Sequence, residues 1–371
     1  MKFIIDDKIP YIKGYAEKLG ETIYKAGAEI TSADVKDVDA MIIRTRTHCN
    51  KSLLQGSKVK FIATATIGYD HIDTQYLKEV GITWTNCPGC NANSVAQYIE
   101  SCLLLLSAHG CWSKKHLSAV TSPIEHLDND FITTFKKLTL GIVGVGNVGK
   151  AVLNTAKRMG FKNILLCDPP RAIKENNKLF ATIDDIAQKA DIITFHTPLT
   201  FSDQSPYPTY HLANDHFFSL LKPTAVIINS SRGEVVDTKA LKYALSNHLI
   251  QTAIIDTWEQ EPNIDVELLH QLFIGTPHIA GYSADGKANG TRMSLQALAK
   301  FFNKDTAFIK NIVPPTLPIN FKYCTECENW KISNKLKLYD PTHDYLELLN
   351  NPQNFELIRG NYPLRREHLK E

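Results

Sequence analysis

The sequence predicts an α/β protein in which a Rossmann domain is joined to a flavodoxin-like split domain and followed by a small α+β C-terminal domain. Short apolar runs alternate with helical patterns, a G-x-G-x-x-G turn follows one of these runs, and a proline-rich linker precedes the last segment. With 371 residues the chain is too long for one hydrophobic core, so two or three domains are expected.

Residues 1–100 are expected to form the flavodoxin-like domain, completed by a helix over about 285–302. Helical patterns at 11–19, 51–54 and 73–80 separate four apolar runs that predict buried parallel strands, namely Phe3–Ile5, Ala40–Ile43, Phe61–Ala63 and Ile82–Trp84. Open α/β sheets bind ligands beyond the carboxyl ends of their strands. The loops at 44–46 and 64–70 are therefore candidates for a substrate site, although polar turns with no further role would look the same.

The glycine-rich turn marks a second domain, expected over 101–284 and entered through a helix at 93–109. The apolar run 138–143 is followed by Gly144, Gly146 and Gly149, with Asn147 and Val148 at the start of a helix. These glycines allow a tight turn, close approach of a pyrophosphate and close helix packing, while the helix N-terminus favours phosphate.

A second strand, 163–167, ends in Asp168 about 20 residues after the last glycine, as a dinucleotide fold requires. A carboxylate there accepts a hydrogen bond from a ribose 2′-hydroxyl and repels a 2′-phosphate. The pattern therefore predicts NAD, and Arg171 is the one feature that favours NADP.

Three later strand ends carry side chains suited to hydride chemistry. Arg232 could grip a carboxylate with two N–H groups, His278 could exchange a hydroxyl proton, and Glu261 could orient the imidazole. His196 also follows a strand and Glu259 competes with Glu261, so position alone leaves these alternatives open.

Composition excludes several classes of partner. The formal net charge is +2 with no basic tract, so neither nucleic acid nor an anionic membrane is expected as a partner. Asp6 and Asp7 interrupt the first apolar residues, and the longest apolar run is too short to span a bilayer, so a cytoplasmic protein is expected. The pairs Cys87/Cys90 and Cys324/Cys327 could serve a metal or redox role, but buried or incidental thiols fit better, and no metal is expected.

The last segment, expected to form its own domain over 303–371, starts with the linker 312–318. A strand-like run at 319–323 and two helix starts, Asp340-Pro341 and Asn351-Pro352, follow it. So few residues with so little apolar content are marginal alone, so they are expected to pack on another surface, most simply a second copy of the chain.

Several motifs together resemble the D-isomer-specific 2-hydroxyacid dehydrogenases, namely Gly144–Gly149, His196–Leu199, Asn229–Asp237, Asp256–Pro262 and Thr276–Gly281. In that family the Arg, Glu and His of these motifs are catalytic, which implies that Arg232, Glu261 and His278 form the catalytic trio. The resemblance also implies an NAD cofactor, nucleotide contacts at Asp168, Thr197, Asp256 and Gly281, and an active site in the cleft between two domains.

Residues 61–73, 88–92 and 359–367 look like one branch of this family, which oxidises a phosphorylated 2-hydroxy acid and forms a homodimer through an extra C-terminal domain. The matching positions imply substrate contacts at Thr45, Thr66 and Tyr282, and Arg44 is our candidate for the substrate phosphate. Residues 324–335 depart from that branch. The alternatives are another dehydrogenase of the family, such as one acting on 3-phosphoglycerate, or a non-catalytic NAD-sensing scaffold.

Overall fold

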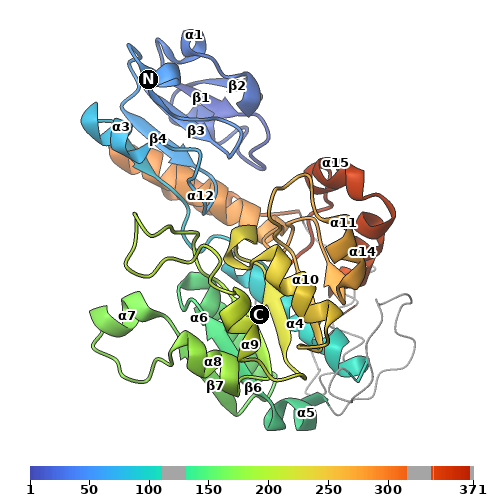
Figure 1. The fold of residues 1–371 in the computed structure, drawn as a ribbon. Helices are drawn as coiled ribbons and strands as arrows, with labels where there is room; N and C mark the ends of the chain where they lie inside the picture. Colours follow the sequence, from blue (N-terminus) through green and yellow to red (C-terminus); the bar gives the residue numbers. More distant parts are fainter. Residues whose placement is uncertain (111–130, 316–335, 337, 368–371) are drawn as a thin grey trace. The chain divides into compact units, whose positions relative to one another are not determined.

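The computed structural model describes residues 1–110, 131–315, 336 and 338–367 (Figure 1). The chain divides into two compact units, the first comprising Met1–Ala92 with Tyr282–Phe321 and the second Asn93–Gly281 with Lys322–Glu371. Each unit is built on one parallel sheet with helices on both faces, so the α/β fold class is confirmed.

The sheet of the first unit has the strand order β2-β1-β3-β4-β5. Its strands are β1 (Lys2–Asp6), β2 (Glu21–Lys25), β3 (Ala40–Ile43), β4 (Phe61–Thr64) and β5 (Thr83–Thr85). Four of these match predicted strands, but β2 was not predicted. The pattern at 11–19 forms only the 3-10 turn η1 (Ala16–Lys18), so the helix predicted there is wrong.

The two faces of this sheet are covered by different helices. Short helices lie over one apolar cluster that includes Val35, Leu54 and Leu77, and they are α1 (Ser32–Val35), α2 (Lys51–Leu54) and α3 (Thr74–Glu79). The opposite cluster is closed by α12 (Ala284–Phe301), the orange helix of Figure 1, through Leu295 and Leu298. Residues 285–302, which we predicted to complete the first domain, lie in the first unit. The 3-10 turns η2 (Gly27–Glu29) and η4 (Ala307–Asn311) complete the unit.

The sheet of the second unit has the order β11-β10-β9-β8-β6-β7. Its strands are β6 (Thr139–Val143), β7 (Asn163–Cys167), β8 (Ile192–Phe195), β9 (Val226–Asn229), β10 (Thr252–Ile255) and β11 (Ile274–Gly275). The order reverses at β6, between β7 and β8, and the carboxyl end of such a switch point is where doubly wound sheets bind their ligands. The glycine-rich turn follows β6 at this point.

The helices of this unit connect successive strands. They are α4 (Ala92–Ala108), α5 (Phe131–Lys137), α6 (Asn147–Arg158), α7 (Pro169–Lys174), α8 (Ile183–Lys189), α9 (Asp215–Ser219), α10 (Thr238–Ser246) and α11 (Val266–Gln271), with the 3-10 turn η3 (Gly233–Val235). The strands β8, β9 and β10 between them are buried on both faces, which is why they appear in the sequence as nearly continuous apolar runs.

Described C-terminal residues pack on the second unit of the same chain. Here α14 (Pro341–Asn350) begins behind the capping carboxylate of Asp340 and lies against β11, and Tyr345 is fully buried. The 3-10 turn η5 (Pro352–Asn354) and α15 (Phe355–Gly360) follow. The helix start at Asp340-Pro341 is confirmed, whereas Asn351-Pro352 begins only a 3-10 turn without a side-chain cap and α15 starts three residues later. The strand-like run 319–323 and the departure at 324–335 lie outside the described residues.

Arg365 fixes the end of this segment. Its guanidinium is buried, donates to the carbonyls of Ile279 (3.0 Å) and Ala280 (2.6 Å) and to Gln97 Oε1 (3.1 Å), and lies 4.0 Å from the centre of the Tyr339 ring. Because these two carbonyls belong to the loop that follows β11, Arg365 ties the C-terminal segment to that loop.

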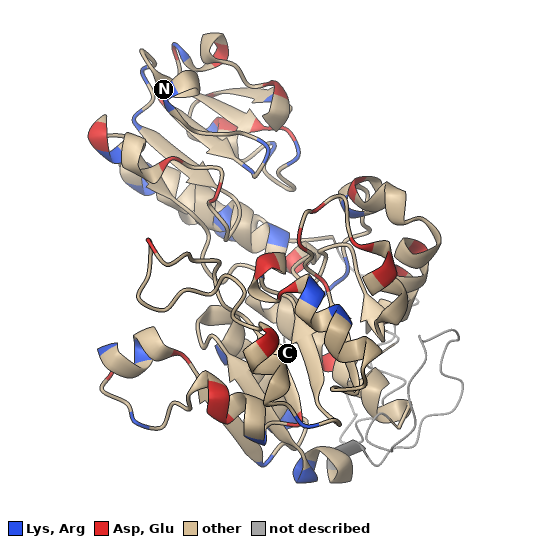
Figure 2. Ribbon diagram, viewed as in Figure 1, with Lys and Arg blue, Asp and Glu red and all other residues tan. Residues whose placement is uncertain are grey.

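Charged and apolar residues are distributed as in an ordinary globular protein. Lys and Arg are interspersed with Asp and Glu over both units (Figure 2). Within the described ranges no helix is both long and apolar enough to cross a membrane. The cysteines that the structure describes are buried free thiols, as predicted, namely Cys49, Cys87, Cys90, Cys102 and Cys167, whereas the Cys324/Cys327 pair is outside the described residues.

Candidate active site

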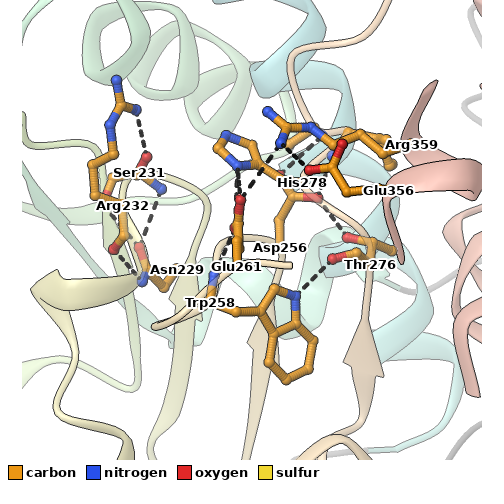
Figure 3. A network of polar contacts seen from close by, with 12 residues as sticks. Asn229, Ser231, Arg232, Asp256, Trp258, Glu261, Thr276, His278, Glu356 and Arg359 are labelled. Carbon is orange, nitrogen blue, oxygen red and sulfur yellow. Dashed lines mark hydrogen bonds and ion pairs between the residues drawn. The ribbon is translucent and has the colours of Figure 1, made fainter. Parts of the chain in front are cut away.

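His278 and Glu261 form a hydrogen-bonded pair between the loops that follow β11 and β10 (Figure 3). His278 Nδ1 lies 2.8 Å from Glu261 Oε2 and 3.1 Å from Oε1, and the Trp258 amide donates to Oε1 at 2.9 Å. The carboxylate occupies Nδ1, so Nε2 is the nitrogen that can exchange a proton with a bound molecule.

The ionised form of Glu261 is favoured by its surroundings. Burial raises the pKa of this carboxyl, but the His278 charge, the bonds from His278 and Trp258 and the charge of Arg359 outweigh burial, so its pKa lies below the ordinary value. A negative carboxylate at Nδ1 stabilises an imidazolium, which is the form His278 takes after accepting a proton.

The loop that carries His278 has a strained backbone conformation and strong support. His278 has φ +57°, in the left-handed region. The buried Asp256 carboxylate accepts from Thr276 Oγ1 (2.7 Å) and from the amides of Ile279 (2.8 Å) and Ala280 (3.0 Å), on either side of the histidine. Asp256 therefore holds the loop in the shape that presents His278, and it is almost fully buried in doing so.

Arg232 lies in the loop that follows β9. The Asn229 side chain donates to the Arg232 carbonyl at 2.8 Å and accepts from the Ser231 amide, and Arg232 Nη1 donates to the Ser231 carbonyl at 2.8 Å. Figure 3 shows Arg232, Glu261 and His278, which follow the successive strands β9, β10 and β11 of the sheet. The second unit thus brings the three predicted catalytic residues to one edge of its sheet.

The competing residues have other contacts. Glu259 contacts His211 Nε2 (2.7 Å) and the Thr238 amide (3.0 Å), whereas Glu261 is the carboxylate that contacts His278. His196 is partly buried with Nε2 3.0 Å from Thr194 Oγ1, and its surroundings lower its pKa to about 3 by desolvation, which keeps it neutral. Geometry therefore favours Glu261 and His278 as the acid–base pair.

Arg359 of α15 is a cation near this pair for which the sequence predicted no role. Its Nη1 lies 3.7 Å from Glu261 Oε2 and 3.6 Å from Glu356 Oε1. The residue is distant from Glu261 in sequence, and only the packing of the C-terminal segment brings them together. The motif at 359–367 was the one available signal.

The glycine-rich turn leaves room for a ligand where a dinucleotide fold needs it. Gly144 has φ +85°, and a Cβ there would lie 2.7 Å from the His196 carbonyl oxygen. A Cβ on Gly149 would meet the Gly144 oxygen at 2.1 Å, while one on Gly146 would meet nothing within 4 Å. The first and last glycines thus serve packing, and the open side of Gly146 fits close approach of a pyrophosphate.

Two polar groups near this turn suit a nucleotide. The Thr197 hydroxyl is buried and has no hydrogen-bond partner among the residues that the structure describes, and unpaired buried hydroxyls are uncommon. Asp168 accepts from the amides of Val145 (2.8 Å) and Arg171 (3.1 Å), so it joins the turn to the end of β7. Asn147 and Val148 are the first two residues of α6. Gly281 is the last residue of the Asn93–Gly281 segment of the second unit.

The predicted substrate contacts Arg44, Thr45, Thr66 and Tyr282 belong to the first unit. Arg44 Nη1 donates to the Lys8 carbonyl (3.2 Å), Thr66 Oγ1 donates to the Gly68 carbonyl (2.8 Å), and Thr45 is exposed. The Lys287 ammonium lies 3.9 Å from the centre of the Tyr282 ring. Their hydroxyl and guanidinium groups are of the kind that binds carboxylates and phosphates.

Comparison with known proteins identifies the class. Residues 112–280 match the family described as "D-isomer specific 2-hydroxyacid dehydrogenase, NAD binding domain". Among solved structures, the D-lactate dehydrogenase of Aquifex aeolicus complexed with NAD and lactic acid is 23% identical with a TM-score of 0.61, covering 85% of this chain and 100% of its own. The D-2-hydroxyisocaproate dehydrogenase structure is 23% identical with a TM-score of 0.62, covering 81% of this chain and 97% of its own.

Sequence relatives match over a longer range. An erythronate-4-phosphate dehydrogenase of Bacteroides fragilis is 50% identical over 368 residues, which is 99% of this chain and 97% of the relative. An enzyme of the same name from Escherichia coli O1:K1 is 42% identical over 305 residues, 82% of this chain and 74% of the relative. The chain therefore belongs to the D-isomer-specific 2-hydroxyacid dehydrogenases, and residues 112–280, which lie in its second unit, match the NAD-binding domain of that family. The Bacteroides fragilis relative, which matches 99% of the chain, is an erythronate-4-phosphate dehydrogenase.

Proposed function

We propose that the chain catalyses NAD-dependent oxidation of 4-phospho-D-erythronate to (R)-3-hydroxy-2-oxo-4-phosphooxybutanoate, a step in pyridoxine 5′-phosphate biosynthesis. The observation that carries this proposal is the 50% identity to erythronate-4-phosphate dehydrogenases over 99% of the chain, which includes the C-terminal segment. The solved D-lactate dehydrogenase matches 85% of the chain at 23% identity and supports only the fold.

The proposed chemistry follows from the strand-end residues. His278 Nε2 takes the proton of the C2 hydroxyl while the electron pair of the C2–H bond leaves as hydride, and a bound NAD supplies the hydride acceptor. Glu261, 2.8 Å from His278 Nδ1, stabilises the imidazolium that forms. Arg232 holds the substrate carboxylate with paired N–H groups and polarises the C2 oxygen.

Cofactor and substrate contacts complete the proposal. We assign NAD to the glycine turn at Gly144, Gly146, Asn147, Val148 and Gly149, because the structure leaves the side of Gly146 open. Asp168, Thr197, Asp256 and Gly281 are the further nucleotide candidates, and the unpaired Thr197 hydroxyl supports this assignment. Thr45, Thr66, Tyr282 and Arg44 are the candidates for substrate contacts, since they match the family's substrate positions.

A direct assay tests this function. Purified protein is incubated with NAD and either 4-phosphoerythronate or 3-phosphoglycerate, and NADH absorbance is followed. We expect NADH with 4-phosphoerythronate and a much lower rate with 3-phosphoglycerate. The reverse preference would indicate another member of the family, and no NADH with either acid would indicate a non-catalytic scaffold.

We also infer a cytoplasmic homodimer that uses the C-terminal segment. Buried free thiols support a reducing compartment. The segment contains an exposed apolar side chain, Leu357, which suits a contact with a second copy. Light scattering on the purified protein should give about twice the 41.6 kDa chain mass, and a monomer at micromolar concentration would refute the dimer.

A further inference from the structure

A second group of titratable residues lies on the second unit, behind the proposed acid–base pair. His211 is placed between two carboxylates, with Nε2 2.7 Å from Glu259 Oε1 and Nδ1 3.3 Å from Asp237 Oδ2. All three side chains are partly buried. The second oxygen of each carboxylate accepts a hydrogen bond from an amide at the start of α10, Glu259 from Thr238 and Asp237 from Lys239.

The trio could be a metal site from its residue types, but its contacts favour another role. Both ring nitrogens of His211 face carboxylates, and the second oxygens of Asp237 and Glu259 face backbone N–H groups. An imidazole that binds a metal must present a bare nitrogen to it. The arrangement is therefore a set of hydrogen bonds that joins segments of the chain.

The backbone of His211 is bound to the segment that carries Arg232. The His211 amide donates to the Glu234 carbonyl at 2.7 Å, the Ala213 amide donates to the Val235 carbonyl at 3.0 Å, and the Asp237 amide donates to the Ala213 carbonyl at 3.0 Å. Residues 211–213 therefore run alongside 234–237, immediately after Arg232.

The side chain of His211 is bound to the segment that carries Glu261. Glu259 is its partner, and the preceding residue, Trp258, donates its amide to Glu261 Oε1 at 2.9 Å. The two segments touch directly, since a Cβ on Gly233 would lie 2.0 Å from the Trp258 carbonyl carbon. A shift of Glu259 would therefore move the amide that orients Glu261.

We propose that His211 is a positioning residue for the reaction: its imidazole fastens the Glu261 segment to the Arg232 segment, so that both face the substrate in a fixed geometry. This role rests on the proposed function of Glu261 and Arg232 in the same site. Misplacement by a fraction of an ångström lowers turnover without removing a catalytic group.

The test compares His211→Gln with His211→Met. Glutamine keeps an N–H donor near the Nε2 position and methionine of similar size does not, while both are unbranched at Cβ and have a similar strain cost at the positive backbone φ of 49°. His216→Met is the matched control, because His216 is an exposed histidine whose ionic partner is Asp184 (3.6 Å) rather than Asp237 or Glu259. We expect kcat to fall about tenfold in His211→Met, with KM for NAD within about twofold of wild type, and to be largely retained in His211→Gln and His216→Met.

Two results of this comparison would overturn the positioning role of His211, and a third would reject the proposed substrate instead. Equal loss of kcat in His211→Gln and His211→Met, or kcat within about twofold of wild type in His211→Met, would overturn the positioning role. If the wild-type protein produces no NADH from 4-phosphoerythronate, the proposed substrate fails instead. Hydrogen exchange at the Trp258 amide then decides the role of His211, which requires faster exchange in His211→Met than in His211→Gln.

Discussion

Replacing Glu261 by Gln gives the sharpest test of the proposed mechanism. The change keeps the size of the side chain and removes the negative charge 2.8 Å from His278 Nδ1. A hydrogen bond to a charged group contributes about 1.5–3 kcal/mol, and tenfold in rate corresponds to about 1.4 kcal/mol. If the bond reaches full strength only when His278 is protonated, kcat should fall about 10- to 150-fold.

The assay is steady-state reduction of NAD with 4-phosphoerythronate, with NAD affinity measured separately by fluorescence. Affinity should be unchanged, because the glycine turn lies at the end of β6 and Glu261 in the loop after β10. Glu356→Gln is the control, since Glu356 also lies near Arg359 (3.6 Å) but is not the partner of His278. We expect it to change kcat by less than about threefold.

A kcat for Glu261→Gln within about twofold of wild type would refute the reasoning, because the imidazolium would then need no carboxylate. The same conclusion would follow if Glu356→Gln lowered kcat as much as Glu261→Gln does. In that case the charge around Arg359, rather than the bond to Nδ1, would control the rate.

Further predictions concern other single residues. His278→Ala should lose about 10²–10⁴-fold in kcat while still binding NAD, as measured by NADH production and NAD titration. Arg232→Gln should raise KM for the hydroxy acid and lower kcat, with KM for NAD nearly constant. Asp168→Ala should shift the ratio of kcat/KM for NAD over NADP toward NADP by at least about tenfold, and an unchanged ratio would remove Asp168 from cofactor choice. Burial lowers the pKa of His71 from 6.5 to about 4, so the unfolded chain takes up a proton at this histidine at a higher pH than the folded protein does. Titration of His71 therefore costs no stability above pH 6.5 and lowers the free energy of unfolding as pH falls toward 4. Between pH 7.5 and pH 5 the free energy of unfolding, measured with urea, should therefore fall by about 2 kcal/mol less in His71→Gln than in wild type.

The strands and long helices were predictable where burial imposes a clear pattern. Strand β4 and strand β9 are apolar on both faces, and the sequence shows each as an unbroken apolar run. Strand β2, Glu21–Lys25, was missed because it is an edge strand with an exposed or half-exposed side chain at every position. The helix predicted at 11–19 failed because Tyr11 and Gly14 have positive φ and break the helical path.

The candidate site was only partly predictable, because its supporting contacts join distant segments. The strand-end positions of Arg232, Glu261 and His278 could be read from the sequence, and the structure distinguishes Glu261 from Glu259 by their different partners. Arg359 could not be assigned, since only folding brings α15 to Glu261. His211 was not a candidate either, because an isolated histidine before a short helix gives no indication of the two carboxylates that it contacts.

The left-handed backbone of His278 bears on the stability of the protein as well as on its activity. A non-glycine residue in that region costs about 1–2 kcal/mol, and the bonds of Asp256 to the adjacent amides offset this cost. Glycine would adopt φ +57° with less strain, but it would also remove the imidazole that lies 2.8 Å from the partly buried Glu261 carboxylate, so relief of strain alone does not predict a higher unfolding temperature. The strained backbone and the stabilising pair therefore belong to the same residue, and a variant at position 278 needs a melting measurement and an activity measurement together.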